Sequence, residues 1–164
     1  MRMDVEFDPA GWQDARRRLQ EMKTRAQNLI PAWNELLDWW AKQNRAHFAT
    51  RGERWRTPWA PLAESTIAEK TRLGYPLDPL VRTGQMRSHL TGRPLGFERL
   101  SQTSVTAGTR LQRAVFHQRG TRHMPRRPLV NAAQVTREQA ATAAVRSWIV
   151  SGHATVNPTE ALRP

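Results

Sequence analysis

The side chains that most often catalyse reactions or bind metals are sparse in this sequence of 164 residues. Cysteine is absent, which excludes disulfides, thiolate metal ligands and cysteine nucleophiles. The five histidines are scattered, and the spacing of His117 and His123 does not place two metal ligands on one turn of a helix. Because neither a Gly-x-Ser-x-Gly elbow nor a glycine-rich phosphate loop occurs, we expect no catalytic residue, no cofactor and no metal. A serine and a histidine that meet only in the fold stay open as an alternative.

Cationic chemistry is much better represented, and it is concentrated in one segment. The chain has 26 Lys and Arg against 14 Asp and Glu, a net charge of +12, and residues 82–127 hold ten arginines but one acid, Glu98. So few acids argue against an acid–base hydrolase or a metal-dependent nuclease. Guanidinium groups suit phosphate and carboxylate, so we expect DNA or an acidic protein as partner. Arginine-rich codon usage is an alternative that does not explain the missing acids. The candidate partner-facing residues are Arg82, Arg87, Arg110, Arg113, Arg119, Arg122, Arg126 and Arg127.

A folded scaffold has to position these arginines, and the length suits one domain with a hydrophobic core. No apolar run reaches the roughly 18 residues that a membrane-spanning helix needs. The first seven residues include Asp4 and Glu6 where a signal peptide requires an apolar stretch. We therefore expect a soluble, unprocessed protein without a membrane partner.

The strongest structural signal is a helical seam between residues 12 and 40. Its apolar positions alternate in spacing between three and four, which is typical of one face of a helix. They are Trp12, Ala15, Leu19, Met22, Ala26, Leu29, Trp33, Leu36 and Trp40. Pro31 falls inside the seam, so we expect a kink or two helices that meet near residues 28–31. The seam stays in phase across the proline, which predicts that both halves pack on the same neighbours. Ahead of it, residues 3–7 alternate in polarity and predict a short strand that ends at Pro9.

Shorter elements follow. Residues 51–62 mix Gly, Pro, Arg and Trp and predict an ordered loop, after which Ser65 could cap a short helix that ends near Gly74. A further short helix is expected after Thr83 and Gly84. Residues 95–100 and 103–108 predict the two strands of a hairpin, and a third apolar run lies at 114–117. Residues 120–128 form an arginine-rich loop with prolines, residues 131–149 predict a helix, and residues 151–164 predict a flexible tail.

Large aromatic side chains are the expected anchors of this scaffold. Trp55 and Trp59 should pin the loop at 51–62 to the core, and Trp148 lies on the apolar face of the last helix. Each tryptophan could instead lie in an interface between subunits. The candidate core or interface anchors are Trp33, Trp40, Trp55, Trp59 and Trp148.

Five short motifs, in this order, resemble the virion morphogenesis or tail completion proteins of tailed bacteriophages. They are Arg51-Gly52 followed by residues 59–62 and Ser65-Thr66; residues 80–87; residues 105–109; residues 117–120; and residues 124–129. The last two resemble the family's His-Gln-x-Gly turn and its Met-Pro-x-Arg-Pro strand opening. The resemblance spans roughly residues 10 to 135, and its turn residues are Gly84, His117, Gly120, Pro125 and Pro128.

The resemblance implies a structural, non-enzymatic virion protein at the head–tail interface, or neck, that acts in tail completion or tail-to-head joining. It implies a homo-oligomeric ring, hexameric in this family, that assembles in the cytoplasm of the bacterial host. The implied partners are other copies of the chain, neighbouring connector or adaptor proteins, and tail terminator or tail tube proteins. Packaged DNA in the channel is a further candidate.

The elements and the resemblance together predict an α+β fold. It has a long, proline-kinked pair of N-terminal helices, a small curved antiparallel sheet and a C-terminal helix. One domain is expected at residues 1–150, with a helical hairpin or kinked helix at 10–50 and a Trp/Pro loop at 51–80. The sheet and arginine-rich loops follow at 81–130, then the helix at 131–150 and the flexible tail at 151–164.

A second function stays open, which is sequence-independent nucleic-acid binding through the arginine-rich segment 82–127. Base stacking is poorly supported, because Phe97 and Phe116 are the aromatic residues of this segment. Contact with the phosphate backbone is the expected mode.

Overall fold

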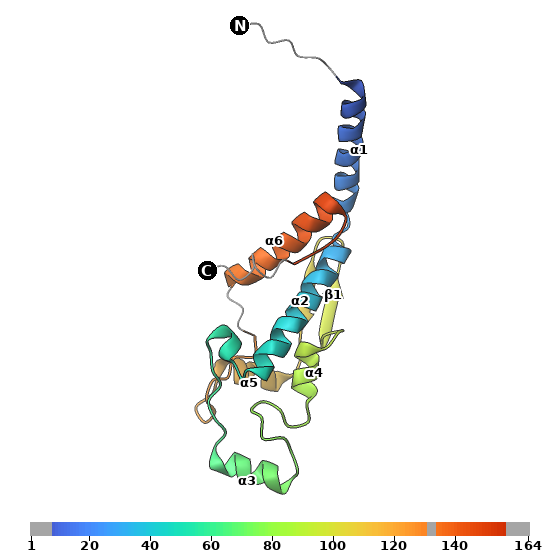
Figure 1. Cartoon of the computed structure of the whole chain (residues 1–164). Coiled ribbons are helices and arrows are strands. Elements are labelled where there is room, and N and C mark those ends of the chain that lie inside the picture. Colours follow the sequence, from blue (N-terminus) through green and yellow to red (C-terminus); the bar gives the residue numbers. More distant parts are fainter. Residues whose placement is uncertain (1–7, 131–133, 157–164) are drawn as a thin grey trace, which may run out of the picture.

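The computed structural model describes residues 8–130 and 134–156, and within them the chain has the expected α+β fold (Figure 1). The elements in order are α1 (Pro9–Ala26), α2 (Ile30–Ala49), the 3-10 helix η1 (Glu53–Trp55), α3 (Glu64–Arg72), α4 (Gln85–Thr91), β1 (Phe97–Leu100), β2 (Val105–Gly108), α5 (Gln112–Arg119) and α6 (Gln134–Ser151). The strand expected at residues 3–7 lies outside the described residues. No described helix is both long and apolar enough to cross a membrane.

The N-terminal helix pair breaks where the sequence predicts. α1 ends at Ala26 and α2 begins at Ile30, and Pro31 lies in the first turn of α2, where its missing N–H costs no helical hydrogen bond. The Asn28 side chain accepts a hydrogen bond from the Ile30 N–H at 3.2 Å. The Leu29 N–H donates to the carbonyl of Gln102 at 2.9 Å, which ties the junction to the hairpin.

The core is built on α2, with α6 across one part of it and α4 packed further along (Figure 1). Ala140 and Ala144 of α6 are fully buried, and these small side chains let α6 approach Ala32 and Trp39 of α2 closely. A second cluster joins the end of α2 to α4, α5 and the chain that follows α5. Its buried members are Phe48, Trp59, Met86, Leu90, Ala114 and Leu129.

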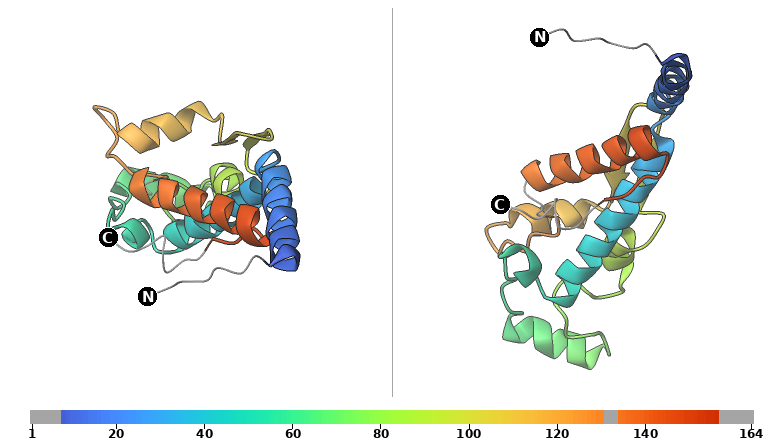
Figure 2. Two further views of the ribbon diagram at one scale, coloured as in Figure 1. Left: turned by 90° about the horizontal axis from the view of Figure 1, so that it is seen from above. Right: turned by 45° about the horizontal axis from the view of Figure 1, so that its top comes forward.

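Helix α1 departs from the predicted packing. No residue of α1 is buried, and Trp12 and Leu19 are 59% and 63% exposed. Figures 1 and 2 show α1 continuing beyond the rest of the molecule, and its C-terminal end lies against α6. The prediction that both halves of the seam pack on the same neighbours is wrong for most of α1, because residues 8–130 and 134–156 bring little surface against Trp12 and Leu19.

The hairpin is confirmed. β1 and β2 pair antiparallel, with Phe97 opposite Gly108 and Leu100 opposite Val105. The apolar run at 114–117 belongs to helix α5 and adds no strand. Residues 124–128, which resemble a strand opening, lie outside any described strand, and Met124 forms an isolated antiparallel bridge with Thr121. Ser65 is not a helix cap, because α3 begins one residue earlier, at Glu64.

The segment expected to be a flexible tail begins by folding back on α6. Thr155 accepts a hydrogen bond from the Ser147 hydroxyl at 3.1 Å through its carbonyl, and its N–H donates to the same hydroxyl at 2.8 Å. Val156 is buried in the cluster between α2 and α6. The prediction is therefore wrong for residues 152–156, and residues 157–164 lie outside the described residues, as do the first residues of the helix expected from 131.

Candidate functional site

Motif residues that lie far apart in the sequence meet around one carbonyl group. The carbonyl of Pro128 accepts a hydrogen bond from Trp59 Nε1 at 2.7 Å and lies 2.9 Å from His47 Nε2. Because a carbonyl only accepts, Nε2 of His47 carries the proton. We call this cluster, His47, Trp59, Gln118, Arg127 and Pro128, the motif junction. It joins α2, the Trp/Pro loop, α5 and the chain that follows α5.

Gln118 on α5 holds the next segment as a neighbouring strand would. Its Oε1 accepts hydrogen bonds from the N–H groups of Leu129 at 2.8 Å and Val130 at 3.1 Å, and its Nε2 donates to the Val130 carbonyl at 3.0 Å. Gly120 ends α5 with φ of 75°, a conformation that favours glycine. The His-Gln-x-Gly motif therefore turns the chain and fixes residues 129 and 130 against α5.

Arg127 is buried, whereas the sequence-based assignment places it among the partner-facing arginines. It is 6% exposed, and its guanidinium donates to the carbonyls of Ala60 at 2.8 Å and Pro61 at 2.7 Å. Burial lowers the pKa of Arg127 from its ordinary value. The side chain fastens the Trp/Pro loop to the motif junction.

A second buried cation was missed by the sequence reasoning. Lys70 of α3 points its ammonium at the carbonyls of Pro76, Asp78 and Val81, at 2.7, 2.8 and 2.7 Å. Burial lowers the pKa of Lys70, and the Asp78 carboxylate opposes that shift. Lys70 thus closes the turn-rich connector after α3. The sequence shows a lysine on a short helix ahead of a proline-rich connector. That pattern does not distinguish a buried lysine that binds carbonyl groups from a lysine exposed to solvent.

Several of the predicted site residues do surround one groove. A cavity of about 740 Å³ opens between α3, the start of α4, α5 and residues 123–127. From the predicted set it gathers Arg82, Arg113, Arg127, Gly84, His117 and Pro125, and it is also lined by Lys70 and His123. None of its described lining residues is acidic, so the groove is electropositive. Arg82 pairs with Glu69 at 3.1 Å, and Arg113 donates to the Gln85 side chain, so both are already held.

The remaining predicted arginines are exposed but are not gathered in this groove. Arg110 stacks over Phe97, with 4.2 Å from its Cζ to the ring centroid, and Arg126 donates to the Gln118 carbonyl at 3.2 Å. Three others make no side-chain hydrogen bond or ion pair within the part of the chain that the structure describes. They are Arg87, Arg119 and Arg122.

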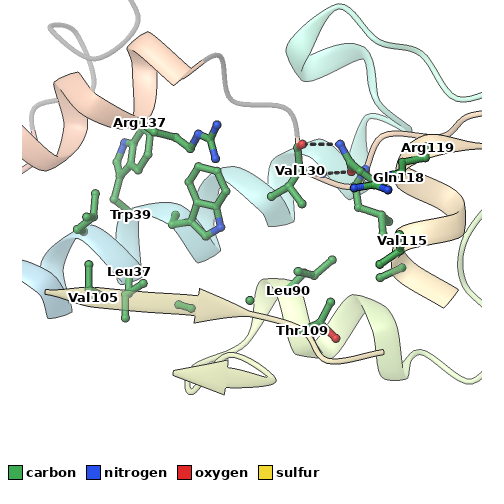
Figure 3. A pocket seen from close by; sticks show the side chains of 16 residues that line it. Leu37, Trp39, Leu90, Val105, Thr109, Val115, Gln118, Arg119, Val130 and Arg137 are labelled. Atoms are coloured by element: carbon green, nitrogen blue, oxygen red, sulfur yellow. Dashed lines mark hydrogen bonds between the residues drawn. The ribbon is translucent and has the colours of Figure 1, made fainter. Parts of the chain in front are cut away.

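An apolar groove of about 490 Å³ lies on the other side of α5, between α2, β2, α5 and α6 (Figure 3). Leu37, Trp39, Leu90, Val105 and Val130 form much of its wall, and Arg119 and Arg137 are its charged lining residues. Val115, at its edge, is 48% exposed. Leu36 and Trp40 of the predicted seam also line this groove, but the sequence did not predict that a space would remain between these elements.

The five candidate tryptophan anchors all contact the body of the protein. Trp33 and Trp59 are buried, and Trp40, Trp55 and Trp148 are half-buried. Trp55 stacks on His47 with 4.1 Å between ring centroids and on Trp40 with 6.2 Å. Trp148 Nε1 donates to the Asn28 carbonyl at 2.8 Å, which links α6 to the end of α1.

We predict that His47 and His117 make the protein less stable in mild acid. Burial lowers the pKa of His47, against the effect of its bond to the Pro128 carbonyl, and burial with nearby Arg127 and Arg113 lowers the pKa of His117. Below pH of about 6.5 the unfolded chain therefore takes up protons that the folded chain refuses, so the free energy of unfolding decreases as pH falls. The slope has an upper limit of about 1.4 kcal/mol per pH unit for each histidine, which corresponds to the uptake of one full proton on unfolding.

Urea unfolding at several values between pH 7.5 and 5.5, above the range in which ordinary carboxyl groups titrate, measures this slope. His47→Gln should lower it to about half, whatever the variant's stability at pH 7.5. Equal slopes for the two proteins would show that His47 is not held neutral by the fold.

No known protein family, curated protein or solved structure matches this chain. Within residues 8–130 and 134–156, no three metal-binding side chains come together.

Proposed function

We propose that this chain is a structural virion protein of a tailed bacteriophage that acts at the head–tail interface in tail completion or tail-to-head joining. It works without catalysis, as a homo-oligomeric ring that is hexameric by resemblance. The observation that carries the proposal is the motif junction. Residues on which the resemblance depends, around Trp59, His117 and Pro128, are joined there into one hydrogen-bonded unit.

The chemistry of the motif junction supports a scaffold role for these motifs. The polar groups of Trp59, Gln118 and Arg127 are engaged with backbone groups of other segments. A catalytic group needs a free donor or acceptor within reach of a substrate, and these groups are already occupied. The motifs therefore fix the shape of a subunit, which is what a precisely assembled ring requires.

The partners follow from this role. Copies of the chain contact one another, and neighbouring connector or adaptor proteins and tail terminator or tail tube proteins lie above and below the ring. The electropositive groove and the exposed arginines offer sites for acidic partner surfaces or for packaged DNA in the channel. The protein is then found in the virion, after assembly in the bacterial cytoplasm.

The proposal predicts rings and incorporation into particles. Purified full-length protein should sediment as a closed oligomer and show rings in negative-stain electron micrographs, and mass spectrometry should find the chain in purified particles of the phage that encodes it. A protein that stays monomeric at all accessible concentrations and is missing from particles would contradict the proposal.

A second candidate function, sequence-independent binding of nucleic acid, is favoured by the side chains of Arg87, Arg119 and Arg122, which are exposed and have no partner among the described residues. Three phosphate contacts give a slope of about −2.7 in log K against log salt, or roughly 40-fold weaker duplex binding from 50 to 200 mM salt. Replacing the three arginines with glutamine should remove that dependence. Duplex binding weaker than millimolar at 50 mM salt would exclude this function.

A further inference from the structure

Helix α1 carries an apolar stripe that the described part of the chain leaves largely uncovered. The stripe consists of Trp12, Ala15, Leu19, Met22 and Ala26, and none of these side chains is buried. A helix in water draws most of its stability from packing its apolar face, and an exposed row that includes a tryptophan and a leucine marks an interaction surface. The stripe therefore needs a partner.

The stripe does not fill the apolar groove of its own chain, because the C-terminal end of α1 is fixed in place. The Arg25 guanidinium donates to the carbonyls of Ile149 and Val150, each at 3.1 Å, and Trp148 Nε1 donates to the Arg25 carbonyl, also at 3.1 Å. These bonds hold the base of α1 at the C-terminal end of α6. In both figures of the whole chain α1 extends away from the body formed by the other described elements (Figures 1 and 2).

The apolar groove has the size and lining that the stripe requires. Its volume is about 490 Å³, roughly three times the 150 Å³ that suffices for a benzene ring in an apolar cavity. Leu37, Trp39, Leu90 and Val105 supply apolar walls from three different elements, and Val115 is exposed at the edge (Figure 3). An indole and the aliphatic side chain two turns further along a helix can be accommodated there.

Unpaired charges of opposite sign lie beside the two surfaces in the described part of the chain, while the two charged residues that line the groove itself, Arg119 and Arg137, are both positive. Arg16 and Lys23, each one residue after a member of the stripe, make no hydrogen bond or ion pair through their side chains within the described residues. Glu35 is equally unpaired there, and it lies one turn before Trp39 of the groove on α2. Opposite charges at the border of an apolar contact favour one orientation of docking.

We propose that α1 of one copy docks its stripe into the apolar groove of the next copy. This inference rests on the proposed ring and names the contact that builds it. The stripe and the groove are different patches, so the contact is heterologous, and repeated contacts close into a ring when the rotation between copies permits. Trp12, the largest side chain of the stripe, is the main anchor, because tryptophans are enriched among the residues that dominate binding energy at interfaces.

Disulfide trapping tests this contact directly, because the chain contains no cysteine of its own. Full-length Ala15→Cys and Ala107→Cys proteins place one thiol in the stripe and one in the groove. Mixed and mildly oxidised, they should give a covalent heterodimer on a non-reducing gel. The matched control is Ala10→Cys, on the opposite face of α1, which should give at least fivefold less heterodimer with Ala107→Cys. The double variant Ala15→Cys/Ala107→Cys should give a ladder of oligomers.

Other results would overturn the contact. Strong homodimers of Ala15→Cys alone would show that two copies of α1 pair with each other, and a double variant closed only within single chains would show that α1 reaches its own groove. Sedimentation of the same samples separates the two proposals. Oligomers without the mixed disulfide overturn this contact but leave the ring intact, whereas monomers at every concentration overturn both.

A substitution adds an independent readout. Trp12→Ala should weaken self-association at least 10-fold, whereas Gln13→Ala, its neighbour outside the stripe, should change it less than threefold. Equal association constants for the two variants would overturn the assignment of Trp12 as the anchor.

Discussion

Replacing Trp59 with alanine should lower the free energy of unfolding by about 3–5 kcal/mol, the usual cost of truncating a buried aromatic side chain. Trp59 is 8% exposed and packs edge-on against Phe48, with 5.1 Å between ring centroids, and against His47, with 5.3 Å. Its Nε1 also donates to the Pro128 carbonyl. The substitution therefore opens a cavity and removes a buried hydrogen bond in the same place. Urea unfolding followed by circular dichroism measures the loss.

Two matched variants separate these contributions. Trp59→Phe retains much of the ring but has no N–H, and the Pro128 carbonyl keeps its contact with His47, so we expect a smaller loss of about 1–2 kcal/mol. Trp12→Ala removes an equally large side chain that is 59% exposed, so it should change stability by less than about 0.5 kcal/mol. Dilute samples avoid a contribution from subunit association. A loss below 1 kcal/mol for Trp59→Ala would show that the motif junction does not hold the fold together.

Local sequence patterns predicted both strands of the hairpin and the helices other than η1 and α5, because the causes of these elements are local. Pro31 has no N–H and so marks the first turn of α2. Gly84 precedes α4 with φ of 78°, and the alternating residues on both sides of a polar turn form the hairpin of β1 and β2. Each of these outcomes depends on residues within a few positions of one another.

Packing between distant elements could not be predicted in the same way. The periodicity of residues 12–26 shows which face of α1 is apolar, but whether this chain covers that face depends on where α6 lies. The fold-back of residues 152–156 has the same origin. Thr155 is held by Ser147, and Val156 fills a space that forms only once α2 and α6 meet.

The sequence predicted which residues belong to the candidate site, but it did not predict their positions or contacts in the fold. Arg126 and Arg127 are adjacent in the sequence, yet Arg126 is exposed and Arg127 is buried against carbonyls of the Trp/Pro loop. Gln118 lies in a recognised motif, but its bonds to Leu129 and Val130 require the turn at Gly120 to be in place. The number of charges in a segment does not tell which arginine is exposed and which is buried, because burial depends on the groups that the fold places next to each side chain.

Because Arg127 is buried, we expect Arg127→Ala to cause a large loss of stability. Removing the guanidinium leaves the carbonyls of Ala60 and Pro61 without their donor and empties the space that the side chain fills. We expect a loss of about 2–4 kcal/mol in the free energy of unfolding, since each buried polar group left unsatisfied costs about 1–3 kcal/mol. Arg127→Lys, which can reach at most part of this pair, should give an intermediate loss. Denaturant unfolding of the three proteins tests this order.

Arg122→Ala is the matched control, because Arg122 is exposed and its side chain makes no hydrogen bond or ion pair with the described residues. It should leave stability within about 0.5 kcal/mol of the parent protein. If an anionic partner is bound, Arg122→Ala should instead weaken that binding in a salt-dependent way. The reverse pattern, with Arg127→Ala fully stable but defective in partner binding, would return Arg127 to the partner-facing surface. Because both changes remove one positive charge, a difference in stability between them reports the position of the arginine in the fold and not the net charge of the chain.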